Sequence, residues 1–73
     1  MRKKLVEALK DKYRADYSTA HASLNIYMTN PVGIGEHPQH FEEMDKLVES
    51  MTAARDKLEV LNEEYPDAIH LAE

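Results

Sequence analysis

The residues best suited to bind a metal lie in the segment 36–43. His37 and His40 are three residues apart, and Glu36 and Glu43 flank them. On a helix, side chains at this spacing share one face and can bind the same ion, as the Glu-x-x-His motifs of helical bundles do. Alternatively, His37 precedes or caps a helix and His40 lies at its solvated end. We keep His37 and His40 as a candidate metal pair that would be assembled across a dimer.

The segment 30–37 contains two glycines and apolar side chains and is expected to be a turn. Gly33 and Gly35 could form an anion-binding loop before a helix, but the segment lacks the lysine and hydroxyl of a phosphate-binding loop. Conformational freedom in a turn explains both glycines better. Val32 and Ile34 either fold back over the end of the hairpin or form an apolar knob for a partner.

No combination of residues predicts an enzyme active site. The chain has 73 residues and no cysteine, which excludes disulfides, thiolate metal sites and a cysteine nucleophile. Ser18, Thr19 and His21 are too close on one helix to form a catalytic triad. We therefore expect a protein that is not an enzyme and that needs no cofactor.

Two long segments free of internal glycine and proline must position these residues. They predict helices over about 3–29 and 38–64, ended by Pro31 and Pro66. The expected stripe of the first helix is Leu5, Leu9, Tyr13, Tyr17, Ala20, Leu24, Tyr27 and Met28. The second helix carries a coiled-coil-like repeat of Met44, Leu47, Met51, Ala54, Leu58, Leu61 and Tyr65.

A short turn between long helices predicts an all-α antiparallel hairpin, residues 1–73 forming one domain with 66–73 as a terminal turn or tail. In this fold, facing residues have numbers that add up to about 68, which sets Tyr27 opposite Phe41 and Leu9 opposite Leu58. Phe41, Val48, Val60, Ile26 and Met28 then remain uncovered. A dimer of hairpins forming a four-helix bundle is the simplest way to cover them; a larger partner is the other.

Charge is distributed unevenly along the chain. The net charge is −5, but residues 1–14 carry six basic and two acidic side chains. A free basic arm would favour nucleic acid. The hairpin instead places Lys3 and Lys4 beside Glu63 and Glu64, so nucleic-acid binding is not expected.

The turn resembles a known group of proteins. Its residues are Asn30-Pro31-Val32-Gly33-Ile34-Gly35-Glu36-His37-Pro38, and the run Asp56-Lys57-Leu58-Glu59-x-Leu61 follows. Together they look like small uncharacterised helical-hairpin proteins of tailed bacteriophages, including cyanophages. The resemblance implies a viral protein in the bacterial cytoplasm or in the virion, and it assigns no activity.

The expected function is therefore protein–protein interaction. The hairpin would self-associate and dock on a host or phage protein through Val32, Gly33, Ile34, Gly35, Phe41 and Val48. Two alternatives stay open: an acidic effector that mimics nucleic acid, motivated by eleven acidic and three basic residues in 36–73, and a metal-binding bundle. No apolar run is long enough to span a membrane, so a cytoplasmic location is expected.

Overall fold

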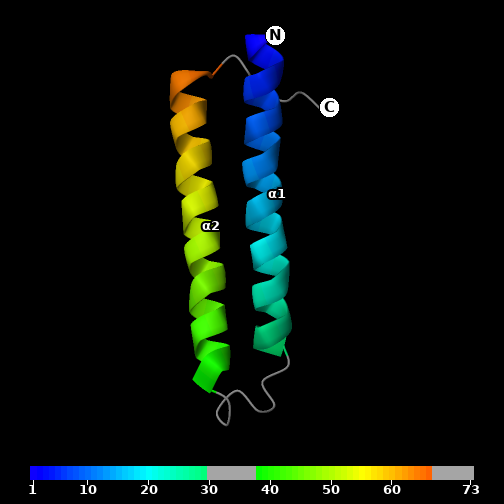
Figure 1. Ribbon diagram of the computed structural model, residues 1–73, viewed down its shortest axis with the longest axis vertical. Coiled ribbons are helices and arrows are strands. Elements are labelled where there is room, and N and C mark those ends of the chain that lie inside the picture. The colour runs from blue at the N-terminus through cyan, green and yellow to red at the C-terminus, as the bar shows by residue number, and fades with distance from the viewer. Residues whose placement is uncertain (30–37, 67–73) are drawn as a thin grey trace.

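The computed structural model describes residues 1–29 and 38–66 and is a helical hairpin (Figure 1). Helix α1 spans Arg2–Thr29 and helix α2 spans Pro38–Glu64. No strand occurs within the described ranges. The predicted all-helical hairpin and the predicted helix bounds are therefore confirmed, the bounds to within one residue, and the four-helix bundle formed by dimerisation stays a prediction.

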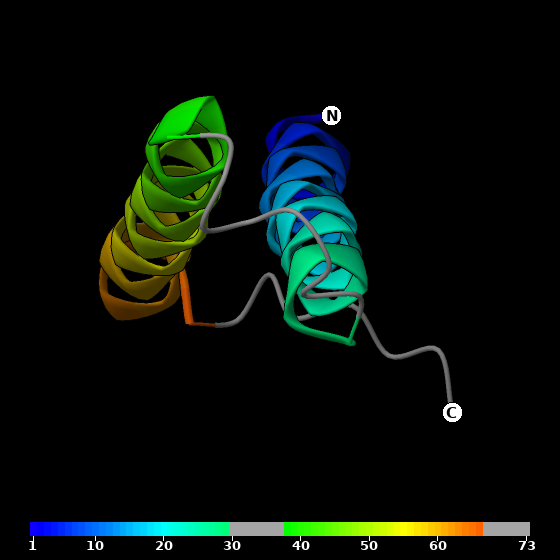
Figure 2. The same ribbon diagram turned by 90° about the horizontal axis from the view of Figure 1, so that it is seen from below.

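Two views at right angles show α1 and α2 side by side and antiparallel (Figures 1 and 2). The molecule measures 50 × 22 × 15 Å. Helices of 28 and 27 residues rise about 40 Å at 1.5 Å per residue, so they account for most of the long dimension. Residues 30–37, which include the predicted turn contacts of Val32, Gly33, Ile34 and Gly35, lie outside the described residues, as do residues 67–73.

The two helix ends differ in their local contacts. The hydroxyl of Thr29 donates to the carbonyl oxygen of Asn25 at 2.8 Å and lies 3.4 Å from that of Ile26, in the last turn of α1. At the end of α2, the amide of Tyr65 still donates to Leu61 at 2.8 Å. The helix stops there because the ring of Pro66 cannot continue it.

The helices meet along one line of buried and half-buried side chains, here called the seam. Spacings alternate between three and four residues on both helices, which keeps one side of each turned to the other. The seam consists of Val6, Lys10, Tyr13, Tyr17, Ala20, Leu24 and Tyr27 from α1, and His40, Met44, Leu47, Met51, Ala54, Leu58, Leu61 and Tyr65 from α2. Ala20 and Ala54 are buried within it.

Four contacts across the seam define the register. An arginine or lysine lies over a tyrosine ring in three of them, and two rings meet in the fourth. The pairs are Arg2–Tyr65, Tyr13–Lys57, Tyr17–Arg55 and Tyr27–His40. Their residue numbers add up to 67, 70, 72 and 67, close to the predicted value of about 68.

The predicted stripe of α1 is wrong in its first turns. Leu5 is 62% exposed and Leu9 is 39% exposed, whereas Lys10 is fully buried. Stepping back three residues from Tyr13 leads to Lys10, and stepping back four leads to Leu9. Hydrophobicity favours Leu9, but the regular three–four repeat continues through Lys10 to Val6.

The predicted pairing at the turn end also needs correction. Phe41 does not face Tyr27, since its side chain is 61% exposed. The ring of His40 takes that place, with its centroid 5.5 Å from the centroid of Tyr27. Met28, expected on the stripe, is 59% exposed.

Candidate interaction surface

Lys10 crosses from α1 to the end of α2. Its ammonium group donates a hydrogen bond of 2.7 Å to the carbonyl oxygen of Tyr65. The last carbonyls of a helix lack partners within the helix and carry the negative end of its dipole, so a cation is well placed there. The four methylene groups of Lys10 meanwhile fill a seam position with apolar surface. This contact holds the open end of the hairpin together.

Large apolar side chains outside the seam remain exposed on both helices. Residues seven apart on a helix lie on the same side, so their spacing assigns them to two faces of the hairpin. The predicted uncovered residues Ile26, Met28, Phe41, Val48 and Val60 are all between 47% and 66% exposed. The expectation that one hairpin leaves apolar surface uncovered is therefore confirmed.

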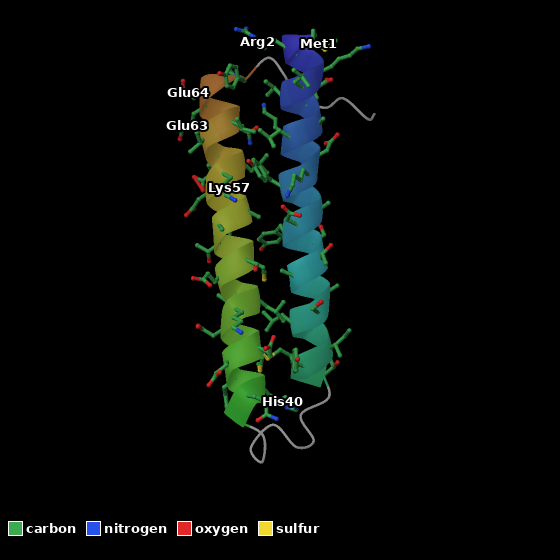
Figure 3. The ribbon with its side chains drawn as sticks, in the orientation of Figure 1. Met1, Arg2, His40, Lys57, Glu63 and Glu64 are labelled. Atoms are coloured by element: carbon green, nitrogen blue, oxygen red, sulfur yellow. The ribbon has the colours of Figure 1, made fainter. Side chains whose placement is uncertain are left out.

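One face, here called the Lys57 face, contains a shallow groove of about 400 Å³. Small side chains on both helices form it, and Tyr13, Asp16 and Lys57 border it. The face carries Leu5, Leu9, Lys12, Asp16, Thr19, Ser23 and Ile26 from α1, and Lys46, Ser50, Ala53, Lys57, Val60 and Glu64 from α2. Lys57 marks it in Figure 3.

The opposite side, here called the Phe41 face, has a smaller hollow of about 380 Å³ beside Tyr17. Arg55 lies over the ring of Tyr17 at 5.4 Å and donates a 2.9 Å hydrogen bond to its hydroxyl. The face carries Arg14, Ser18, His21 and Met28 from α1, and Phe41, Val48 and Arg55 from α2. Phe41, Val48 and Met28 are all exposed on it. The partner-binding roles of Phe41 and Val48 stay a prediction.

Three ion pairs among the described residues lie within a single helix. Lys12 binds Asp16, and Arg14 binds Asp11, each at 2.8 Å within α1. Lys46 lies 3.7 Å from Glu43 within α2. Side chains one turn apart on a helix meet without bridging the seam, so these local pairs form readily.

Asp16 also changes the acidity of its partner. The hydrogen bond from Lys12 to the carboxylate of Asp16, together with the negative charge of that carboxylate, raises the pKa of Lys12 above 10.5. Both groups are solvent-exposed. Lys12 therefore remains charged throughout the neutral pH range.

The carboxylates on the outer side of α2 form a separate stripe. Glu42, Glu49, Asp56 and Glu63 follow one another at intervals of seven residues, and all are exposed. Figure 3 shows Glu63 on the side of α2 that faces away from α1. The predicted pairing of this residue with the basic start of α1 is therefore wrong: position 63 is two residues after the seam residue Leu61, which turns it outward.

The predicted metal pair is only partly within the described residues. His40 is half-buried in the seam against Tyr27, with its Nδ1 atom shielded from solvent, and His37 lies outside the described residues. Within residues 1–29 and 38–66, no three His, Asp or Glu side chains are grouped to hold a metal. A metal at this end stays a prediction.

Neither described helix is long and apolar enough to cross a membrane. Comparison with known proteins gives no match: no family model, no curated protein and no solved structure matches this chain.

Proposed function

We propose that this chain is a non-enzymatic interaction protein, a helical hairpin that self-associates and docks on a larger protein of a bacterial host or a phage. The observation that carries the proposal is the amount of surface left uncovered. Eight large apolar side chains of the described residues are exposed, and their exposed fractions range from 39% at Leu9 to 91% at Met1.

Much of the exposed surface is apolar, because Leu5, Ile26, Phe41 and Val60 are each more than half exposed. Of the apolar residues in the described ranges, Ala20 and Ala54 alone are below one-tenth exposure. A core this small contributes little stability on its own, and burying further apolar surface against a second chain is one way to stabilise the fold.

The Phe41 face is the proposed docking surface for the larger protein. Phe41 and Val48 lie about one and about three turns from the start of α2 at Pro38, and the predicted turn knob of Val32 and Ile34 precedes that helix in the sequence. Aromatic side chains such as Phe41 are enriched in the cores of protein–protein interfaces, and burying neighbouring aliphatic side chains adds apolar area.

Capture from a lysate of infected host cells tests the docking surface. The wild-type protein is compared with Val48→Glu and with Val32→Ser/Ile34→Ser, and Ala22→Glu adds the same charge at an exposed position on the far side of α1. We expect one specific protein to be lost with the first two variants and kept with Ala22→Glu. Capture of the same proteins by all four chains would contradict the proposal.

The exposed carboxylates of α2 support a second candidate, an effector that occupies a basic site. The four residues of the outer stripe are joined by Asp45 and Glu59, which are also exposed. They supply one charge per about 5 Å of helix, whereas duplex DNA carries one per about 1.7 Å. This lower charge density ranks nucleic-acid mimicry second. Binding to a basic protein that does not weaken between low and high salt would exclude it.

A further inference from the structure

We propose that the Lys57 face is covered by a second copy of this chain. A two-fold axis crosses the helices at right angles, so that α1 packs antiparallel on α1 of the second copy and α2 packs antiparallel on α2. This inference rests on the self-association part of the proposed function and names the surface that mediates it. A two-fold interface must be complementary to itself, which is a strict condition on a sequence.

The charges on the face define the position of the axis. Lys12 and Asp16 lie on the same side of α1, one turn apart. An antiparallel α1–α1 contact can place Lys12 beside Asp16 of the second copy when paired residue numbers add up to about 28. The two local ion pairs then become a ring of four alternating charges around the axis, which favours this position over neighbouring ones.

This position of the two-fold axis also places the exposed Leu5 and Leu9 over the groove of the second copy. Leu9 comes opposite Thr19 of the second copy, and Leu5 comes opposite Ser23. Both partners are small, and both line the groove. The two exposed leucines of one copy thus lie over the groove of the other copy, as close packing between helices requires.

The axis position chosen for α1 also pairs complementary residues of α2. Within one hairpin, the numbers of facing residues add up to about 69. An axis that passes residue 14 of α1 therefore passes about residue 55 of α2, and it pairs residues of α2 whose numbers add up to about 110. Val60, which is 56% exposed, comes opposite Ser50, another residue that lines the groove. Lys46 comes opposite Glu64, with opposite charge. One choice of axis therefore accounts for both helices.

About this axis, the Phe41 face does not meet the condition. The same axis applied there sets Arg14 against Arg14 of the second copy and Arg55 against Arg55. Like charges placed opposite each other in an interface are unfavourable. The Phe41 face is consequently left for a different partner, in agreement with its proposed docking role.

A charge-exchange experiment tests the position of the axis. Lys12→Asp produces four acidic groups around the axis of its own dimer, and Asp16→Lys produces four basic ones. We expect each variant alone to dimerise more weakly than the wild type, and an equimolar mixture at low salt to form a heterodimer at least about tenfold tighter than either homodimer. Native mass spectrometry identifies the heterodimer directly. A mixture that associates no better than the separate variants would overturn the proposed axis.

A second pair of variants tests the choice of face. Leu9→Glu and Val48→Glu each add one charge at an apolar position of similar exposure, 39% and 47%, on opposite faces. Light scattering should show dimers weakened at least about 100-fold by Leu9→Glu, which acts twice per dimer, and unchanged dimers for Val48→Glu. Circular dichroism confirms that both variants remain helical.

The outcomes separate this inference from the proposed function. If the wild type dimerises and Val48→Glu disrupts it while Leu9→Glu does not, self-association stands and the Lys57 face is wrong. If the wild type is a strict monomer at high micromolar concentration, the dimer inference and the self-association part of the proposed function both fail. Docking through the Phe41 face is then judged by its own capture experiment.

Discussion

Replacing Lys10 by methionine should weaken the hairpin because it removes the ammonium group and keeps the length of the side chain. The fully buried Lys10 donates a 2.7 Å hydrogen bond to the carbonyl oxygen of Tyr65. A hydrogen bond that involves a charged group contributes about 1.5–3 kcal/mol, and burying a methionine in place of an ammonium returns part of this. We expect a net loss of about 1–2 kcal/mol.

For a chain of this size, that loss lowers the thermal midpoint by about 5–15 °C. Circular dichroism at 222 nm measures the midpoint, with all variants at one protein concentration because association also stabilises the fold. Lys10→Ala should lose a further 2–5 kcal/mol, approximately, because it also removes the buried stem. Lys4→Met, at an exposed position of the same helix, serves as the control and should leave the midpoint unchanged.

The reasoning fails if Lys10→Met is as stable as the wild type or more stable. Such a result would mean that the cost of burying the ammonium group equals or exceeds the contribution of its hydrogen bond, as happens at some buried ionic sites. The contact with Tyr65 would then determine the register of the hairpin without stabilising it.

Three further predictions concern the seam and its borders. Ala54→Leu should destabilise the hairpin by about 1–3 kcal/mol in urea unfolding, because Ala54 is 4% exposed in the seam and a side chain larger by three carbon atoms must displace its neighbours. Tyr17→Phe removes the exposed hydrogen bond from Arg55 but keeps the stacked ring, so the same measurement should show a loss below about 1 kcal/mol. The pKa of Lys12 is raised by Asp16, so the stability from this pair is fully present below pH 10.5 and is lost as the pH rises through the higher pKa of the folded state; alkaline titration of Lys12→Met should lack this step.

The type and the length of the two helices follow from the sequence alone. Two long segments without internal glycine or proline, ended by Pro31 and Pro66, predict the helix bounds because proline prevents a helix from continuing. The regular repeat from Met44 to Tyr65 also predicts the contact side of α2. Each of these signals depends on neighbours within a few turns, and local spacing determines such features.

The tertiary structure decides which residue of α1 occupies each seam position. Leu9 and Lys10 both lie at helical spacing from Tyr13, and hydrophobicity alone selects Leu9. Lys10 is buried instead because the carbonyl oxygen of Tyr65, distant by 55 positions in the chain, lies where its ammonium group ends. No local pattern contains that acceptor. With Lys10 in the seam, Leu9 turns outward, and the apolar surface that this exposes is where we propose a second copy to bind.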